Sequence, residues 1–241
     1  MSRVYTDTIE PRKPTQDITL GTAGETISVG ANSINVNTVK DKGGNTLWTS
    51  DGSGVLSSVN AGLIGSLQLI STATATNQAN VQFTSGIDST YSVHIVKFID
   101  IYAHTNGAEF QFNVSINGGS SYGINKTTTF YFSRREEAPN TYSLAYDQNQ
   151  DLANSVDEQN FMIDMKNDAD ACGTGEMWFF NLSGTTYIKN FISNTVNMET
   201  EPAVIHVFTG GIIDTTSAIN ALFFRMNSGN VTGTLKLYGL S

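Results

Sequence analysis

The chain has 241 residues, a mass of 26.0 kDa and a formal net charge of −9, because 13 Lys and Arg face 22 Asp and Glu. This acidic balance excludes the basic surface with which a nucleic-acid-binding protein neutralises phosphates. Charged residues make up only 15% of the chain, so Ser, Thr, Asn, Gln and Gly supply most of its polarity, and this mixture favours β-strands and turns over helices.

The sequence contains no targeting or membrane-spanning pattern. No stretch approaches the roughly 18 to 20 consecutive apolar residues of a transmembrane helix. The first 16 residues, MSRVYTDTIEPRKPTQ, contain no apolar run of the kind that a signal peptide has. We therefore expect a chain that starts at Met1, is made in a cytoplasm and is released rather than secreted, without membrane insertion. The single cysteine, Cys172, excludes an intramolecular disulfide framework.

Residues 17–64 carry short apolar pairs that Gly, Asn, Asp and Thr separate from one another. Strands with two apolar residues each cannot close a core alone, so they must stack on neighbours or on other copies of the chain. We predict an intertwined, trimerising β stalk or collar here, preceded by residues 1–16 and ending at the AGLIGS segment, 61–66. The pairs are Ile18 and Leu20, Ile27 and Val29, Ile34 and Val36, Leu47 and Trp48, and Val55 and Leu56.

Residues 65–241 show a stronger period of two. The segment EFQFNVSI (109–116) alternates completely, with Phe110, Phe112, Val114 and Ile116 on one face, which indicates a half-buried strand. Similar segments recur between turns such as NGGS (117–120). About ten to twelve short strands with no long helical pattern predict an all-β fold, an antiparallel jelly-roll-like sandwich.

The C-terminal segment TLKLYG is expected to be a strand of this sandwich. Its apolar residues continue almost to the end of the chain, where termini usually fray. We predict that it pairs with ALFFRM (221–226) across the NSGNVTG connection. The C-terminus is then fixed in the sandwich, and the N-terminus is the free attachment end.

The segment DQNQDLANSVDE has oxygen ligands at the spacing of a calcium-binding loop. Asp147, Asn149, Asp151 and Glu158 occupy positions 1, 3, 5 and 12. Leu152 stands where the loop needs Gly, and the flanks resemble strands rather than helices. A solvated loop between two strands is the alternative.

Other residues bear on an enzymatic function. Two carboxyl groups facing one cleft could hydrolyse a glycosidic bond, and the available carboxylates are Glu136, Glu137, Asp147 and Asp164. His94 and His206 lie inside apolar strands and are expected to be hydrogen-bonded core histidines rather than ligands. No phosphate-binding loop, nucleophile elbow or zinc-protease motif occurs in the sequence, and no cofactor is expected.

Several tyrosines lie in or next to polar loops. Exposed rings beside Asn, Gln and Asp are suited to sugars, because the ring stacks on the apolar sugar face while the polar groups bind hydroxyls. The alternative is that these tyrosines seal sheet edges or a subunit contact. The candidate saccharide-binding residues are Tyr122, Tyr142, Tyr146 and Tyr187.

Three stretches together carry a family resemblance: MSRVYTDTIEPR, FTSGIDSTYSVHIVKFIDIYAHTNGAEFQFNVSINGGSSYG and INALFFRMNSGNVTGTLKLYGLS. They resemble minor virion structural proteins of tailed bacteriophages, especially phages of marine bacteria, of the fibre or tail-fibre-like kind. The resemblance covers most of the chain and rests on structural motifs rather than a catalytic signature.

The resemblance implies a non-enzymatic, homotrimeric fibre in the virion, released when the host lyses. An N-terminal segment would dock on tail or capsid proteins, with Tyr5, Ile9, Pro11 and Arg12 as candidate docking residues. A β-sandwich tip would contact host surface saccharide. Two alternatives stay open: a capsid decoration protein or head fibre, and a glycan-degrading tip enzyme.

Overall fold

The computed structural model describes residues 37–41, 43–53, 56–57, 59, 67–139 and 141–240. The described residues form strands and loops without helices, as the sequence predicts, and they therefore include no helix long and apolar enough to cross a membrane. The chain divides into two compact units, Met1–Asn60 and Ala61–Ser241. The candidate docking residues Tyr5, Ile9, Pro11 and Arg12 lie outside the described residues.

The described part of the first unit is a small antiparallel sheet of three strands in the order β1-β2-β3. Its strands are β1 (Thr38–Lys40), β2 (Thr46–Ser50) and β3 (Leu56–Ser57). In the turn between β1 and β2, Asp41 accepts hydrogen bonds from the backbone and side chain of Asn45. The described strands are as short as the apolar pairs predict, although the three pairs between Ile18 and Val36, and also Val55, lie outside the described residues.

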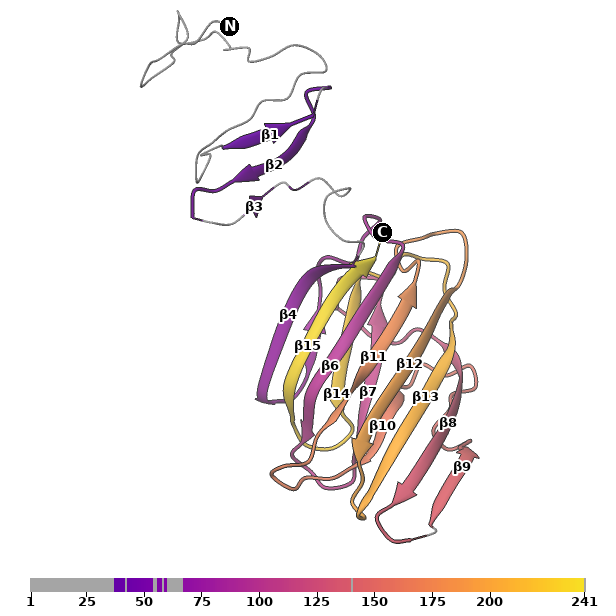
Figure 1. Ribbon diagram of the computed structural model, residues 1–241. Helices are drawn as coiled ribbons and strands as arrows, with labels where there is room; N and C mark the ends of the chain where they lie inside the picture. The colour runs from indigo at the N-terminus through magenta and orange to yellow at the C-terminus, as the bar shows by residue number, and fades with distance from the viewer. Residues whose placement is uncertain are drawn as a thin grey trace, which may run out of the picture. The chain divides into compact units, whose positions relative to one another are not determined.

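The second unit contains an eight-stranded sheet and a four-stranded sheet, both antiparallel (Figure 1). The orders are β4-β15-β6-β11-β12-β13-β8-β9 and β10-β7-β14-β5. The strands are β4 (Leu67–Gln78), β5 (Val81–Phe83), β6 (Val93–Ala103), β7 (Ala108–Ser115), β8 (Lys126–Glu136), β9 (Tyr142–Tyr146), β10 (Gln159–Met165), β11 (Gly173–Phe180), β12 (Lys189–Met198), β13 (Ala203–Ile213), β14 (Ala221–Met226) and β15 (Val231–Leu240).

Phenylalanine rings fill the space between the two sheets. Phe98 on β6 lies 5.4 Å from Phe224 on β14, and Phe112 on β7 lies 4.8 Å from Phe191 on β12, measured between ring centroids. All four rings are buried. Contacts of this kind from both sheets make the second unit an antiparallel β-sandwich with a main core between the sheets, and Phe130, Ile163, Ile205 and Val207 form a second, smaller cluster.

The pairing predicted for the C-terminal segment is wrong. The strand β15 lies between β4 and β6 in the eight-stranded sheet, whereas β14 pairs with β5 and β7 in the four-stranded sheet. The NSGNVTG connection therefore crosses from one sheet to the other. The physical reason is burial: Leu235, Leu237 and Phe224 all face the core, and strands in opposite sheets can bury these side chains against one another.

A β-bulge at Asp100 bends the middle of the eight-stranded sheet. Asp100 has a φ of 53°, a left-handed conformation that Asp tolerates better than most residues. Both neighbouring strands shift register opposite it, β11 between Gly173 and Gly175 and β15 between Thr232 and Thr234. An extra residue of this kind bends its strand and increases the local twist.

Candidate functional site: an aromatic groove on the eight-stranded sheet

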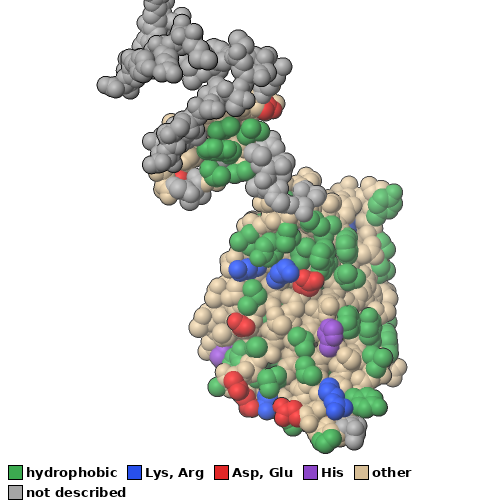
Figure 2. All heavy atoms as spheres, in the orientation of Figure 1, with side chains coloured by type: hydrophobic (Ala, Val, Ile, Leu, Met, Phe, Trp, Pro, Cys, Tyr) green, Lys and Arg blue, Asp and Glu red, His purple; other side chains and the backbone are tan. Residues whose placement is uncertain are grey.

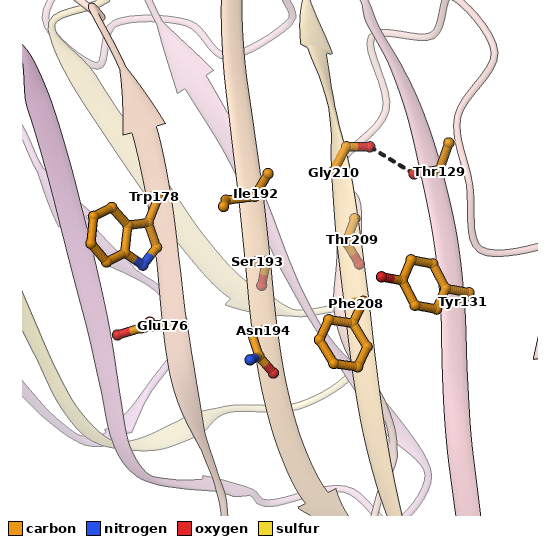
Figure 3. Close-up of a pocket in the computed structure, with 10 residues that line it drawn as sticks. All are labelled: Thr129, Tyr131, Glu176, Trp178, Ile192, Ser193, Asn194, Phe208, Thr209 and Gly210. Atoms are coloured by element: carbon orange, nitrogen blue, oxygen red, sulfur yellow. Dashed lines mark hydrogen bonds between the residues drawn. The ribbon is translucent and has the colours of Figure 1, made fainter. Parts of the chain in front are cut away.

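The outer face of the eight-stranded sheet is rich in apolar side chains (Figure 2). On this face, strands β11, β12, β13 and β8 line a groove with a volume of about 530 Å³ (Figure 3). We call it the aromatic groove. The side chains that define its chemistry are Thr129, Tyr131, Glu176, Trp178, Asn194 and Phe208.

Strand register arranges the groove as two parallel rows. In the first row Trp178 lies opposite Ile192, Ile192 opposite Gly210, and Gly210 opposite Thr129. With neighbouring strands about 4.8 Å apart, this row spans about 14 Å across the four strands.

The second row lies beside the first, two residues away from it on each strand. Glu176 lies opposite Asn194, Asn194 opposite Phe208, and Phe208 opposite Tyr131. Tyr146 on β9 continues the row beyond Tyr131. The period of two therefore places every member of both rows on the same face of the sheet.

Aromatic rings stand on both sides of the groove. Trp178 lies on β11, while Tyr131 and Phe208 lie on β8 and β13 (Figure 3). The Tyr131 and Phe208 rings are stacked, with centroids 5.1 Å apart and an interplanar angle of 9°. Tyr131 is 44% exposed, so its ring edge and hydroxyl remain accessible to a ligand.

Gly210 leaves the middle of the first row without a side chain. A Cβ atom built at this position would lie 3.5 Å from Ile192, which is an ordinary van der Waals contact. The backbone therefore tolerates a side chain here, but such a side chain would stand in the groove between Trp178 and Thr129. The Gly210 carbonyl oxygen accepts a hydrogen bond of 3.3 Å from the Thr129 hydroxyl.

Glu176 supplies a fixed negative charge at one end of the second row. Its carboxylate accepts a hydrogen bond of 2.9 Å from the Lys97 ammonium group on β6. The Lys97 hydrogen bond, and secondarily one from Trp178, lower the pKa of Glu176 below its ordinary value. Glu176 is therefore an ionised hydrogen-bond acceptor held in place beside the indole ring.

The remaining polar groups of the groove are neutral. Asn194 contacts the imidazole Nε2 of His206, which fixes the orientation of its amide. Together, flat rings, an amide, a hydroxyl and a carboxylate offer both stacking surfaces and hydrogen-bond partners. This combination suits a ligand with an apolar face and a rim of hydroxyl groups.

The structure does not bring the four predicted saccharide-binding tyrosines together. Tyr142 and Tyr146 lie on the edge strand β9, and only Tyr146 adjoins the aromatic groove through its pairing with Tyr131. Tyr187 is 72% exposed in the loop between β11 and β12. Tyr122 lies in the loop between β7 and β8, where its ring packs 4.8 Å from Phe223 of β14 and its hydroxyl donates to Gln82 of β5.

The predicted calcium ligands are engaged in other contacts. Asp147 accepts a hydrogen bond of 3.0 Å from the backbone of Asn149, and Asp151 accepts one from the Tyr146 hydroxyl. Glu158 forms an ion pair of 2.6 Å with Arg225. In the part of the chain that the structure describes, no group of three or more His, Cys, Asp and Glu side chains could hold a metal ion. The flanks of the loop are strands, β9 and β10.

The other candidate residues lie apart from the groove, with one exception. Glu136 pairs with Arg134, and Asp164 accepts a hydrogen bond of 2.8 Å from Thr200. His206 contacts Asn194 of the groove. His94 is buried beside Tyr91, as expected for a core histidine, and burial lowers the pKa of its imidazole.

The sequence does not mark the groove aromatics as ligand-binding residues, because they occur inside strongly apolar strands. Trp178 stands between Met177 and Phe179, both fully buried, so a period of two places it on the opposite, outer face. Tyr131 follows the buried Phe130 in the same way. The sequence does contain one signal: both faces of these strands carry large aromatic residues, whereas a half-buried strand needs large apolar residues on its inward face only.

Comparison with protein-family models, with curated proteins and with solved structures gives no match.

Proposed function

We propose that this chain is a bacteriophage virion structural protein, a fibre whose β-sandwich binds saccharide of the host surface. The observation that carries the proposal is the aromatic groove, in which Trp178 and Tyr131 stand on either side of the bare backbone at Gly210. The resemblance of the three sequence stretches to phage fibre proteins supports the virion role, with docking through the N-terminal residues.

Binding without hydrolysis is the favoured activity. A hydrolase that uses two carboxyl groups needs both of them in one cleft, between about 5 and 9.5 Å apart. Of the residues that line the aromatic groove, Glu176 alone carries a carboxylate, and Lys97 holds it in an ion pair. The groove is therefore equipped to hold a sugar ring rather than to cleave its linkage.

The test is binding of the full-length protein to an array of bacterial surface polysaccharides. Trp178→Ala should weaken binding to the best array ligand about tenfold or more, since it removes a stacking surface. Gly210→Leu should also weaken it, because the added side chain fills the groove. Tyr187→Ala is the matched control, since Tyr187 is an exposed aromatic residue outside the groove.

Two results contradict saccharide binding at this site. One is the absence of binding across the array by a correctly folded protein. The other is equal affinity of the Trp178→Ala and Tyr187→Ala variants, which would move the contact away from the groove.

The fibre proposal also includes a homotrimer assembled through residues 17–64. Exposed apolar side chains on β4, Leu67 at 42% and Leu69 at 54%, supply further surface for contact between copies. Light scattering should give the mass of three chains for the full-length protein. A chain that begins at Gly65 should give fewer than three chains per particle. A monomer at micromolar concentration for both chains would contradict the trimer.

A further inference from the structure

Lys126 is the first residue of β8 and is fully buried. Its ammonium nitrogen donates hydrogen bonds to Oδ1 of Asn113, at 2.9 Å, and to the carbonyl oxygen of Ile124, at 3.0 Å. Both acceptors are neutral oxygens. A buried ammonium group without an ion-pair partner is costly, so burial shifts the equilibrium toward the neutral amine.

The Asn113 side chain on β7 is held in one orientation by three hydrogen bonds. Its Oδ1 accepts from Lys126 and also from the backbone N–H of Val114, at 2.9 Å. Its Nδ2 donates to the carbonyl oxygen of Val156, at 3.1 Å. The Val114 N–H polarises the Asn113 carbonyl group and would stabilise the oxyanion that forms at Oδ1 when Lys126 attacks Cγ. Asn113 is only 3% exposed, so little water competes for this carbon.

The surroundings also favour the nucleophilic form of the lysine. Burial lowers the pKa of Lys126 to about 8, against the opposing charges of Glu158 and, to a smaller extent, Asp157. Roughly a tenth of the side chain is therefore a neutral amine at pH 7, compared with well below a thousandth for a free lysine. A desolvated amine beside a polarised amide carbon is an activated nucleophile.

We propose that Lys126 and Asn113 form an intramolecular isopeptide bond. The neutral Nζ attacks Cγ of Asn113, the Nζ–Cγ bond forms, and the Cγ–Nδ2 bond breaks. One proton moves from Nζ to the departing Nδ2, which leaves as ammonia. An amide and an amine become a new amide and ammonia, so no oxidant or other reactant is needed.

We assign the transfer of this proton to the carboxylate of Glu158, whose negative charge acts on Lys126. Glu158 lines, together with Asn113, a groove of about 490 Å³ on the outer face of the four-stranded sheet. We call this the polar groove; its other polar residues include Gln111, Tyr122, Asp157 and Arg225. Both Arg225 contacts to Glu158 are made to the same oxygen, Oε2. The groove also gives the ammonia a path to solvent.

The bond would tie the two sheets together covalently. Asn113 belongs to the four-stranded sheet and Lys126 to the eight-stranded sheet, 13 residues apart in the chain. Separating the sheets would then require more than the loss of core packing. The inference does not depend on saccharide binding, because the aromatic groove lies on the opposite sheet.

Lys189 provides a matched control inside the same chain. It is also buried, but its ammonium nitrogen contacts backbone carbonyl oxygens, including those of Gly184 at 2.6 Å and Tyr187 at 2.8 Å. Burial lowers its pKa as well. Because the hydrogen-bond acceptors around its ammonium group are backbone carbonyl oxygens, Lys189 should remain a free amine.

The test is the intact mass of the purified full-length protein, which should be lower than the sequence mass by one ammonia. Trypsin should no longer cut after Lys126, so the peptide should run from Phe98 to Arg134. Fragmentation of this peptide should release no backbone fragments between positions 113 and 126. The Lys126→Arg variant should have the full sequence mass, and Lys189→Arg should still lack one ammonia.

Variants in the polar groove and the pH dependence extend the test if Lys126→Arg does not fold. Glu158→Gln should slow the mass loss at least about tenfold, and Asp157→Asn should slow it less. The loss should also be faster at pH 9 than at pH 6, because the amine must be neutral. The full sequence mass in folded wild-type protein after long incubation at pH 9 would overturn the proposal. An ammonia loss that persists in Lys126→Arg would overturn it too, since it would report cyclisation of an asparagine instead of a cross-link.

Discussion

The two outer faces of the sandwich differ in what their side chains contact. The eight-stranded sheet presents flat rings and unfilled space around Gly210, with a few polar groups that retain hydrogen-bonding capacity. The four-stranded sheet presents polar side chains that mainly bind one another. Glu109, for example, accepts hydrogen bonds from the amides of Gln150, Asn160 and Asn227. A face whose polar groups satisfy one another stabilises the fold, whereas a face with accessible rings has contacts left to make with a ligand.

The largest expected difference is in the free energy of unfolding, between removing an aromatic side chain from the core and removing one from the aromatic groove. Phe112→Ala should lower the free energy of unfolding by about 3–5 kcal/mol, because it leaves a cavity between the sheets. Trp178→Ala should lower it by less than about 1 kcal/mol, since the indole lies on the partly exposed outer face. Denaturant unfolding followed by circular dichroism measures both. Similar losses for the two variants would mean that Trp178 is a core residue.

A smaller difference in stability is expected when polar residues of the two outer faces are replaced. Glu109→Ala should cost about 1–2 kcal/mol of stability, because three amide donors lose their acceptor, and should leave saccharide binding unchanged. Asn194→Ala should cost less than about 0.5 kcal/mol but weaken binding. Unfolding and array binding of the same two samples give the comparison. The reverse pattern would assign the ligand to the four-stranded face.

The smallest effect concerns pH. The pKa of Glu176 is lowered in the folded state, so the stability from its pair with Lys97 is fully present above the unfolded value near 4.5. This contribution is lost as the pH falls through the folded pKa. The Glu176 contribution to binding and stability should therefore stay constant from pH 7 to about pH 5 and decline below that. Glu176→Gln should remove this component of the decline, whereas Asp168→Asn, an exposed acidic change outside the groove, should preserve it.

Some features of the fold could be read directly from the sequence. The alternation in 109–116 predicts a buried face of Phe110, Phe112, Val114 and Ile116; the first three are buried, whereas Ile116 lies beyond the end of β7 and is 40% exposed. It does not predict that Asn113 and Ser115 are buried as well, because the 147–158 loop and the neighbouring turn supply the covering contacts. A strand pattern reports which side chains share a face; it does not report what lies over that face.

The candidate site also depends on tertiary contacts that the local sequence pattern does not predict. Turn composition predicts Tyr122, Tyr142, Tyr146 and Tyr187 as ligand-binding residues, but polar neighbours in sequence do not place rings from three different segments side by side. The groove instead takes one residue pair from each adjacent strand. Its rows depend on the register between β11, β12, β13 and β8, which single-strand periodicity cannot supply.

By itself the sequence determined the all-β class, the strand-rich second unit and the inward faces of its strands. These depend on local alternation and turn residues, which act over a few positions. Only the tertiary structure decided the sheet order, the separation of β14 from β15, the aromatic groove and the contact between Lys126 and Asn113. Each of these depends on pairing between distant segments, and that pairing is fixed by burying the phenylalanine core from both sheets at once.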